Sequence, residues 1–366
     1  MRLSLESLAP LLAPAAHGID AFIDVRSPAE FAEDHLPGAI NLPVLSNAER
    51  ARVGTVHVQQ DRFAARRMGA ALVARNVAAM LEGPLAQRPR DWRAVVYCWR
   101  GGQRSGALAL VMAQVGWRAQ VLEGGYRSYR RLVARGLYDR PFPAPVIVLE
   151  GNTGTAKTAV LARLAARGVQ VLDLEAMARH RGSLFGEMPG GQPSQKAFES
   201  ALALRMATLD PARPVLVEDE SHRIGRIMVP PALWTAMRVA PRLRVEAPLT
   251  ARAAYLVEGY DDLTAAPERL AARIDALRPF HSRDTVSRWQ AWAQVGAFEA
   301  LAASLLKEHY DPRYRRSRAA RVEPLAVLSA PGLQAPDLDR LAESLHHHIS
   351  DMSGLLIDGS ANNPHA

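Results

Sequence analysis

The strongest constraint on the fold of this chain is a glycine-rich loop that directly follows a strongly apolar run. The run Val146–Leu149 is typical of a buried strand, and Glu150 joins it to the sequence Gly-Asn-Thr-Gly-Thr-Ala-Lys-Thr at residues 151–158. An apolar helical segment then extends to Arg167 and is closed by Gly168. A strand, a loop of free N–H groups and a helix N-terminus, in this order, predict a phosphate-binding loop on a parallel sheet.

Within this loop, Lys157 is expected to neutralise phosphate oxygens and Thr158 to ligate magnesium. Only three of the 45 lysines and arginines are lysines, so a lysine kept in the loop indicates that a point charge is needed there. The strict pattern has glycine where this chain has Ala156, and we expect the methyl group to impair nucleotide turnover more than anion binding. The predicted phosphate-binding residues are Gly151, Asn152, Thr153, Gly154, Thr155, Ala156, Lys157 and Thr158.

Acidic residues follow two further apolar runs. The run 169–174 contains Asp173 and leads to Glu175, and the run 214–217 ends in Glu218-Asp219-Glu220-Ser221. Acids at the carboxyl ends of strands beside a phosphate loop can hold magnesium or its waters. The sequence does not choose among the acids, and a solvated acidic turn would look the same. The predicted metal ligands are Thr158, Glu218, Asp219 and Glu220.

The only cysteine lies in a second strand–loop–helix pattern. Cys98 follows the apolar run 95–97 and precedes two glycines and an apolar helical segment. If the loop curls around Cys98, its N–H groups and the helix N-terminus favour the thiolate, and Arg100 and Arg104 add positive charge. A buried structural cysteine is the alternative, but it would not need these glycines and arginines. We predict Cys98 as catalytic, with an anion cradle made of Trp99, Arg100, Gly101, Gly102, Gln103 and Arg104.

Strands and helices alternate through the first 122 residues, which predicts a mostly parallel sheet covered on both faces. Ser27, Pro28 and Glu30 form a capping box at the start of a helix, and a stretch ending at Ala86 is predicted as a long helix. The proline-rich segment 140–145 predicts a domain boundary. We therefore expect domains at 1–140 and 141–325, the second becoming helical from Pro230 to Leu306, and a helical or partly disordered extension at 326–366.

The composition favours a cytoplasmic protein. Hydrophobic residues make up 48% of the chain, and a single cysteine excludes an internal disulfide framework. No apolar run is as long as a membrane span, so no membrane partner is expected. The net charge of +8 weakly favours a polyanionic partner. A basic cluster beside two tyrosines suits RNA or, equally, a solvated helix end; it comprises Arg313, Arg315, Arg316, Arg318, Tyr310 and Tyr314.

The first part of the chain resembles the rhodanese family. The resemblance rests on Asp24-Val25-Arg26 with Glu30-Phe31, on the segment 35–43 and on the loop that begins at Cys98. It implies that Cys98 carries sulfur or selenium, cradled by the backbone N–H groups of residues 99–104. Asp24 and Arg26 are expected to form a buried pair that serves the fold.

The whole chain resembles the tRNA 2-selenouridine synthase family over about residues 20–315. The matching strings are residues 97–102 with 104–105, 180–183 with 185–186, 192–195 with 198–199, and 218–221 with 224–225. The resemblance implies an α/β protein with an N-terminal rhodanese-like domain followed by a P-loop NTPase-like α/β domain and a helical C-terminal region.

The resemblance also implies a transferase acting on the wobble uridine in the tRNA anticodon arm. This family geranylates 2-thiouridine with geranyl diphosphate, then replaces the S-geranyl group with selenium from selenophosphate, so a selenophosphate supply and Mg²⁺ are implied. His180, Arg181 and Ser183 are expected to contact substrate or to shape a turn. Two alternatives remain: a sulfurtransferase fused to a P-loop kinase or NTPase acting on a small molecule, and a non-catalytic RNA-binding adaptor.

Overall fold

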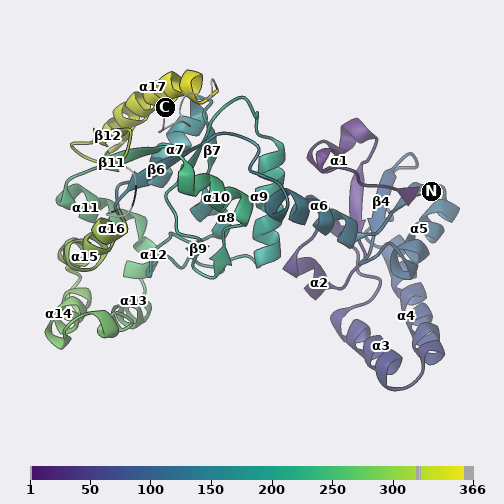
Figure 1. The fold of residues 1–366 in the computed structure, drawn as a ribbon. Helices are drawn as coiled ribbons and strands as arrows, with labels where there is room; N and C mark the ends of the chain where they lie inside the picture. The colour runs from purple at the N-terminus through teal and green to yellow at the C-terminus, as the bar shows by residue number, and fades with distance from the viewer. Residues whose placement is uncertain (1, 319–320, 322, 358–366) are drawn as a thin grey trace. The chain divides into compact units, whose positions relative to one another are not determined.

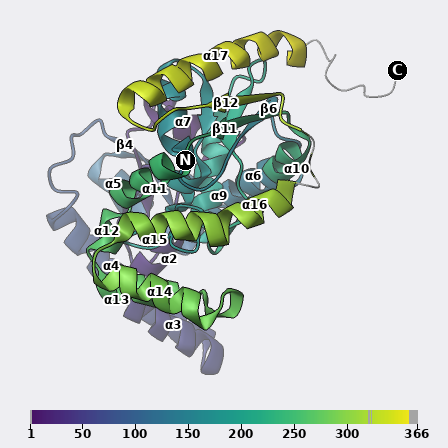
Figure 2. The ribbon, with the colours of Figure 1, turned by 90° about the vertical axis from the view of Figure 1, so that its left-hand side faces the viewer.

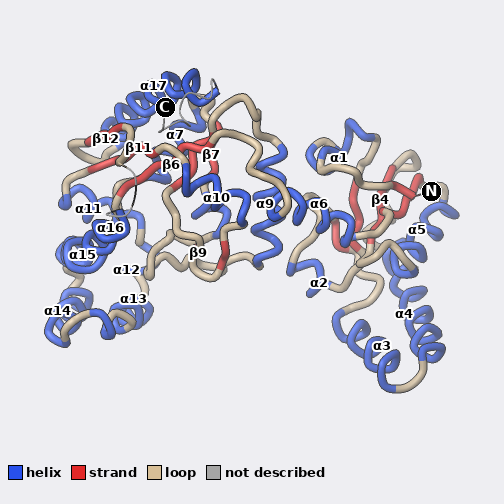
Figure 3. The backbone as a smooth tube through the Cα atoms, in the orientation of Figure 1, coloured by secondary structure: helices blue, strands red, loops and turns tan. Residues whose placement is uncertain are grey.

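A computed structural model describes residues 2–318, 321 and 323–357, which form two compact units. The first unit holds the described residues up to Arg140 together with Pro193–Thr208, and the second holds Pro141–Gln192 and the described residues from Leu209 onward. Figure 3 shows strands at the centre of each unit and helices around them. The predicted α/β class is confirmed for both units.

The first unit is built on a five-stranded parallel sheet with the strand order β1-β5-β4-β2-β3. Its strands are β1 (Arg2–Leu3), β2 (Ala21–Asp24), β3 (Ile40–Asn41), β4 (Arg93–Tyr97) and β5 (Arg118–Leu122). Its helices are α1 (Ala9–Leu12), η1 (Pro14–His17), α2 (Pro28–Glu33), α3 (Asn47–Gln59), α4 (Arg62–Glu82), α5 (Gln103–Val115), α6 (Tyr126–Tyr138) and α9 (Gln195–Ala207). Because β4 lies in the middle of the sheet, the loop that follows it starts from a rigid, buried base.

Two local predictions for this unit are confirmed. Ser27 and Glu30 form the capping box at the start of α2. The Arg26 guanidinium pairs with the Asp24 carboxylate at 2.6 Å, with both side chains almost fully buried. Arg26 also donates to the carbonyl oxygen of Asp34 and lies 4.0 Å from the centre of the Tyr126 ring, so this pair holds elements of the fold together.

The predicted long helix ending at Ala86 is instead two helices, α3 and α4. The helical conformation is interrupted between them at Gln60 and Asp61. The Asp61 carboxylate accepts a hydrogen bond from the N–H of Ala64. An aspartate that caps a new helix competes with continuation of the preceding one, which explains the difference.

Helix α9 belongs to the first unit although it follows the phosphate loop in the sequence. Its Glu199 carboxylate accepts hydrogen bonds from Arg130 and from the Tyr138 hydroxyl, both on α6. Ser200 donates to the Asp34 carboxylate at 2.9 Å. These buried polar contacts place α9 against α6, whereas the sequence predicted a first domain ending at residue 140.

The second unit contains a five-stranded parallel sheet with the strand order β12-β11-β6-β8-β7. Its strands are β6 (Val146–Gly151), β7 (Gln170–Leu172), β8 (Val215–Glu218), β11 (Arg242–Glu246) and β12 (Ala326–Ser329), with a separate pair β9 (Arg223–Ile224) and β10 (Ile227–Met228). Its helices include α7 (Lys157–Ala166), α8 (Leu174–Ala178), α10 (Pro231–Val239), α11 (Leu249–Gly259) and α17 (Ala335–Ile357). Parallel pairing brings the carboxyl ends of β6, β7 and β8 to one edge.

Smaller helices form a layer beside this sheet and have their own apolar core around Trp289 and Ile274. They are α12 (Asp261–Thr264), α13 (Pro267–Asp275), η2 (Arg278–Phe280), α14 (Arg283–Gln294), α15 (Phe298–Leu305), the π-helix η3 (Leu306–Tyr310) and α16 (Asp311–Arg318). Figure 2 shows α14 and α15 side by side, with α16 continuing from α15.

Two strands lie where the sequence predicted helix or an extension. In β11, buried Leu243 and Val245 alternate with Arg242 and Arg244, whose guanidinium groups pair with Glu150. That alternation is a strand signal, hidden in an Arg-rich and Ala-rich background. Strand β12 pairs with β11, and α17 packs on α7 through the second unit's core, so residues 326–357 complete this sheet (Figures 1 and 2). The rest of the predicted extension, residues 358–366, lies outside the described residues.

Candidate functional site

The phosphate loop begins at Gly151, where β6 ends, and leads into α7 at Lys157. A side chain at Gly151 would place its Cβ 2.4 Å from the Thr155 hydroxyl, so only glycine fits this close approach. Gly154 has φ +83°, in the left-handed region that favours glycine. The predicted strand, tight loop and helix are therefore all present, in the predicted order.

Ala156 occupies the place of the usual glycine and adopts a left-handed backbone with φ +56°. This conformation costs a residue with a Cβ about 1 kcal/mol. The Ala156 methyl is buried in the core beneath the loop, so its packing offsets part of that cost. The departure from the strict pattern is therefore accommodated without loss of the loop.

The Lys157 ammonium group donates to the carbonyl oxygen of Gly151 at 3.0 Å. Burial opposes its charge, but electrostatic interactions with Tyr314, and then with Glu175, Glu218 and Glu220, hold the pKa of Lys157 above its ordinary value. Lys157 is therefore a fixed positive charge at the centre of the loop.

Three glutamates gather beside Lys157 and Thr158. The Thr158 hydroxyl donates to Oε1 of Glu218 at 3.0 Å and lies 3.4 Å from Oε2 of Glu175. Burial, followed by the repulsion of neighbouring carboxylates, raises the pKa of Glu175 and of Glu218 to about 8. Burial likewise raises the pKa of Glu220 to about 7. Clustered oxygen ligands that repel one another when ionised suit a bound Mg²⁺, which would relieve the repulsion.

Asp219, in contrast, faces a cluster of arginines. Its carboxylate accepts hydrogen bonds from Arg242 at 2.8 Å and Arg321 at 2.7 Å. Of the acids assigned from the sequence, the structure therefore brings Glu218 and Glu220 to the lysine and commits Asp219 to ion pairs. Glu175, which the sequence analysis noted but did not assign, joins the group because β7 ends next to β8.

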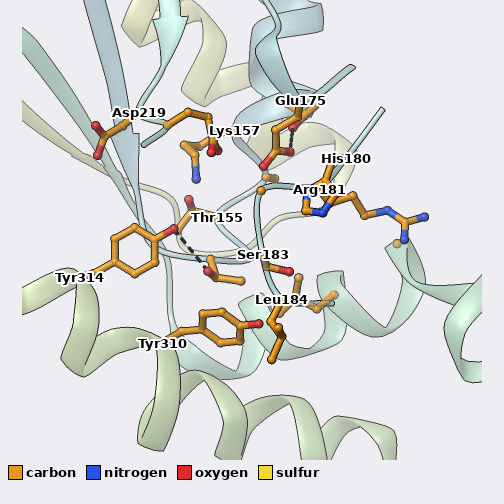
Figure 4. Close-up of a pocket in the computed structure, with 18 of the residues that line it drawn as sticks. Thr155, Lys157, Glu175, His180, Arg181, Ser183, Leu184, Asp219, Tyr310 and Tyr314 are labelled. Carbon is orange, nitrogen blue, oxygen red and sulfur yellow. Dashed lines mark hydrogen bonds between the residues drawn. The ribbon is translucent and has the colours of Figure 1, made fainter. Parts of the chain in front are cut away.

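Lys157, Glu175, Asp219 and Glu220 line a cleft with a volume of about 650 Å³, and the buried Glu218 contacts Thr158, which also lines it. His180, Arg181 and Ser183 also line it, as Figure 4 shows. The structure thus places the three predicted substrate contacts at the phosphate loop.

These three residues also shape the wall of the cleft. The Arg181 guanidinium pairs with Asp262 at 2.9 Å and lies over the Tyr260 ring, and the Ser183 hydroxyl lies 3.4 Å from the Tyr260 hydroxyl. His180 is buried, and its Nδ1 has no hydrogen-bond partner among the described residues. Arg181 and Ser183 therefore help to hold the wall of the cleft together.

Helix α16 closes the other side of the cleft. Arg252 pairs with Asp311 at 2.7 Å, and the same carboxylate accepts from Asn152 in the phosphate loop. The Tyr314 hydroxyl lies 3.4 Å from the hydroxyl of Thr153, and Figure 4 shows Tyr314 pointing into the cleft. These contacts fix α16 to the loop. Additional cations at the cleft are Arg313 and Arg318, on α16, and Arg321, which follows it.

An apolar chamber of about 80 Å³ adjoins the cleft. The two share Thr153, Ser183, Leu256, Tyr260 and Tyr310. Beyond these shared residues the chamber is lined almost entirely by carbon, from Phe185, Val257, Leu263, Thr264, Leu270, Phe298, Leu301, Ala302, Leu305 and Leu306. A ligand that spans both spaces needs an anionic end and an apolar end.

In the first unit, the loop after β4 surrounds the sulfur of Cys98. The N–H of Gly102 and the hydroxyl of Ser105 each lie 3.3 Å from Sγ. Burial alone would raise the pKa of Cys98, but hydrogen bonds from Ser105, Gly102 and Arg100 hold it below its ordinary value. The backbone contributions of Gly102 and Arg100 agree with the predicted cradle, and the Ser105 hydroxyl was missed.

The arginine side chains of this loop act differently from the prediction. Arg104 pairs with Glu30 at 2.8 Å, and Arg100 is exposed. Hydrogen-bond donors, rather than these guanidinium groups, lower the pKa of Cys98. Ser105 follows the cradle, in the first turn of α5. This position was the only sequence feature that could have predicted its hydrogen bond to the sulfur of Cys98.

The other cradle residues shape the loop. Gly101 has φ +66°, and a Cβ there would lie 2.3 Å from the carbonyl oxygen of Leu122. The Trp99 ring packs against Tyr126, with ring centres 5.2 Å apart, and Gln103 begins α5.

Within the described residues, no group of three or more histidine, cysteine, aspartate or glutamate side chains meets the geometry of a metal site. No helix within the described ranges has the length and apolar character needed to cross a membrane.

Two protein-family models match the chain. Residues 7–132 match a rhodanese-like domain, and residues 144–274 match the tRNA 2-selenouridine synthase AAA domain. A tRNA 2-selenouridine synthase from Chromohalobacter salexigens is 36% identical over 349 residues, which cover 86% of this chain and 91% of that protein. The chain belongs to the tRNA 2-selenouridine synthase family.

Further members of the family show the same likeness. A tRNA 2-selenouridine synthase from Alcanivorax borkumensis is 33% identical, covering 80% of this chain and 88% of that protein. One from Aeromonas salmonicida is 39% identical, covering 65% of this chain and 64% of that protein. The predicted order of a rhodanese-like domain followed by a P-loop domain is therefore confirmed.

Proposed function

We propose that this member of the tRNA 2-selenouridine synthase family is a tRNA-modifying transferase. It geranylates the sulfur of a wobble 2-thiouridine with geranyl diphosphate, then replaces the S-geranyl group with selenium from selenophosphate. The observation that carries this proposal is the apolar chamber that adjoins the phosphate loop. Geranyl diphosphate has one diphosphate end and one hydrocarbon end, and it matches both spaces.

The same observation argues against a P-loop kinase or NTPase. A nucleotide would bring a polar base and ribose next to its phosphates, and a chamber lined by leucines and phenylalanines offers them few hydrogen-bond partners. Burial of a hydrocarbon chain there is favourable, at roughly 0.8 kcal/mol for each buried methylene.

In the first reaction, the loop N–H groups and Lys157 hold the diphosphate and stabilise the charge that develops as it leaves. Thr158, Glu218 and Glu175 would hold Mg²⁺, which supplies Lewis-acid stabilisation of the same leaving group. The C1–O bond of the donor breaks, and the sulfur of 2-thiouridine forms a bond to C1. The walls formed by α16 and the segment 180–188 would limit access of water to the allylic centre.

The second reaction is assigned to Cys98. The loop around its sulfur lowers the pKa of the thiol, which favours the thiolate, the form that acts as a nucleophile or as a carrier of selenium. In the net exchange, a C2–Se bond forms, the C2–S bond breaks, and the sulfur leaves as geranyl thiol. The phosphoryl group of selenophosphate is transferred to water, which gives inorganic phosphate.

Mass spectrometry of digested nucleosides tests the whole proposal. Purified protein is incubated with 2-thiouridine-containing tRNA, geranyl diphosphate, selenophosphate and Mg²⁺. We expect S-geranyl-2-thiouridine to appear first and 2-selenouridine to follow. Unchanged 2-thiouridine with intact substrates, together with ATP turnover that ignores tRNA, would favour the kinase alternative instead.

A further inference from the structure

A second hollow, of about 560 Å³, lies in the helical layer of the second unit. It is lined by Phe280, His281, Glu308, His309, Arg313 and Arg316. His309 and Arg313 also line the phosphate-loop cleft, so the two spaces share a wall. The hollow is therefore the immediate neighbour of the cleft.

A chain of hydrogen bonds builds the shared wall. Arg313 Nη1 lies 2.8 Å from Nε2 of His309, and Nδ1 of His309 lies 2.8 Å from Nε2 of His281. Because the guanidinium can only donate, His309 accepts at Nε2 and donates from Nδ1, which makes His281 the acceptor. Burial, with the nearby Arg313 charge, lowers the pKa of His309 to about 4. Both imidazoles are thus neutral, and they hold Arg313 in one orientation.

The π-helix η3 places His309 at this junction. Helix α15 runs into η3 and then α16, so one continuous helical segment carries His309 inward and Arg313 and Arg316 outward. Such π-turns are uncommon and are found frequently at functional sites.

The hollow has surplus positive charge. Its one acid, Glu308, pairs with Arg288 at 2.8 Å and accepts from the Ser304 hydroxyl. Arg313 and Arg316 are exposed, and within the described residues neither forms an ion pair with an acidic side chain, because Glu308 is already paired with Arg288. An anionic ligand is therefore favoured over a cationic one.

The hollow also has a flat, accessible platform. The Phe280 side chain is 60% exposed, although phenylalanine is usually buried in a folded chain. The Arg313 guanidinium lies 4.6 Å from the centre of the Phe280 ring. Aromatic rings with arginines beside them bind unpaired nucleic-acid bases by stacking, with the adjoining phosphates held by charge.

We propose that this hollow binds an unstacked nucleotide of the RNA substrate, next to the uridine that reacts in the cleft. Its base stacks on Phe280, and its phosphate contacts Arg316 and Arg313. This inference rests on the proposed function, because it assumes that RNA is the substrate. It adds a site for a neighbouring nucleotide that the family resemblance and the relatives' names do not assign.

Three exchanges on the full-length protein test the site: Phe280→Ala, Phe280→Tyr and Arg316→Glu. The matched control is Arg315→Glu, because Arg315 is exposed on the same helix but lines neither space. The probe is a fluorescent anticodon stem-loop RNA that contains 2-thiouridine, and affinity is measured by anisotropy at several salt concentrations. Binding of geranyl diphosphate, measured by calorimetry, reports on the cleft independently.

We expect Phe280→Ala to weaken RNA binding about tenfold and Phe280→Tyr to retain it, because a ring is needed for stacking. Arg316→Glu should weaken binding several-fold more than Arg315→Glu, although both change the net charge equally. All variants should bind geranyl diphosphate as the wild type does. If the wild type binds RNA and all variants match the Arg315→Glu control, the proposed site is refuted and the proposed function stands. If the wild type has no affinity for RNA, both are refuted.

Discussion

The Thr158 hydroxyl and the Glu218 carboxylate lie 3.0 Å apart at the start of helix α7. Asp219, the next residue, turns instead toward Arg242 and Arg321. Two neighbouring acids therefore have separate tasks: Glu218 contacts the phosphate-loop residue Thr158, whereas Asp219, at the edge of the cleft, is held in ion pairs with arginines.

These tasks are separable by substitution. Glu218→Gln should raise the Mg²⁺ concentration needed for half-maximal geranylation about tenfold or more, because a charged oxygen ligand is lost. Asp219→Asn should leave that concentration unchanged but lower the free energy of unfolding by about 2 kcal/mol, since two partly buried guanidinium groups lose their charged partner. Metal titrations and denaturant unfolding of both variants check this. A shifted metal requirement in Asp219→Asn alone would reverse the assignment.

The glutamates should make the ligand-free protein less stable as the pH rises. Glu175 and Glu218 have a folded-state pKa of about 8, above the value near 4.5 expected when unfolded, so the folded protein binds their protons more tightly. This contribution is fully present below about pH 4.5 and is lost as the pH rises toward 8. In chelator, we expect the thermal midpoint to fall by roughly 5 °C between pH 5 and pH 8.

A Glu218→Gln variant supplies the control for that experiment, because the amide does not titrate. Its midpoint should change less over the same pH range, and Mg²⁺ with diphosphate should flatten the wild-type curve. A wild-type midpoint that rises through this range while the variant's does not would contradict the assigned pKa directions.

The Cys98 thiolate should depend on Ser105 more than on Arg104. Ser105→Ala removes a donor to the sulfur, so alkylation of Cys98 by iodoacetamide near neutral pH should slow about threefold to tenfold, and its pH profile should shift upward. Arg104→Gln should have little effect, because Arg104 pairs with Glu30. The opposite ranking would restore the arginine-based explanation that the sequence first suggested.

Filling the apolar chamber should exclude the geranyl group and spare the diphosphate. Ala302 lines the chamber from α15, and Glu299 is exposed on the same helix. Ala302→Trp should raise the KM for geranyl diphosphate at least about tenfold while inorganic diphosphate still binds, and Glu299→Trp should change neither. Equal KM values in the two variants would place the hydrocarbon elsewhere.

Sequence reasoning located the parts of the site that depend on short stretches of chain. The phosphate loop and the Cys98 loop each follow one strand and precede one helix, so composition and spacing suffice to find them. Glu175 reaches the cleft only because β7 pairs with β8, and Asp311 reaches Asn152 across more than half of the second unit's sequence. Such contacts are set by strand order and helix packing, which no local pattern encodes.

The same reason explains the errors in the fold. The sequence of β11 alternates like a strand, but its charged positions are stabilised by Glu150 on β6, a partner visible only after the sheet forms. Nothing in the sequence of helix α9 shows that it packs in the first unit, because its Glu199 is matched by Arg130, which lies 69 residues earlier in the chain.

The central claim is that two chemistries are carried out by two different sites in one chain. The most direct test is nucleoside mass spectrometry on Cys98→Ser and Lys157→Ala, each given 2-thiouridine RNA and, separately, RNA already carrying S-geranyl-2-thiouridine. We predict that Cys98→Ser accumulates the S-geranyl nucleoside without selenation, and that Lys157→Ala leaves 2-thiouridine unchanged but selenates the pre-geranylated RNA. Loss of both reactions in both folded variants, or normal geranylation by Lys157→Ala, would contradict this account.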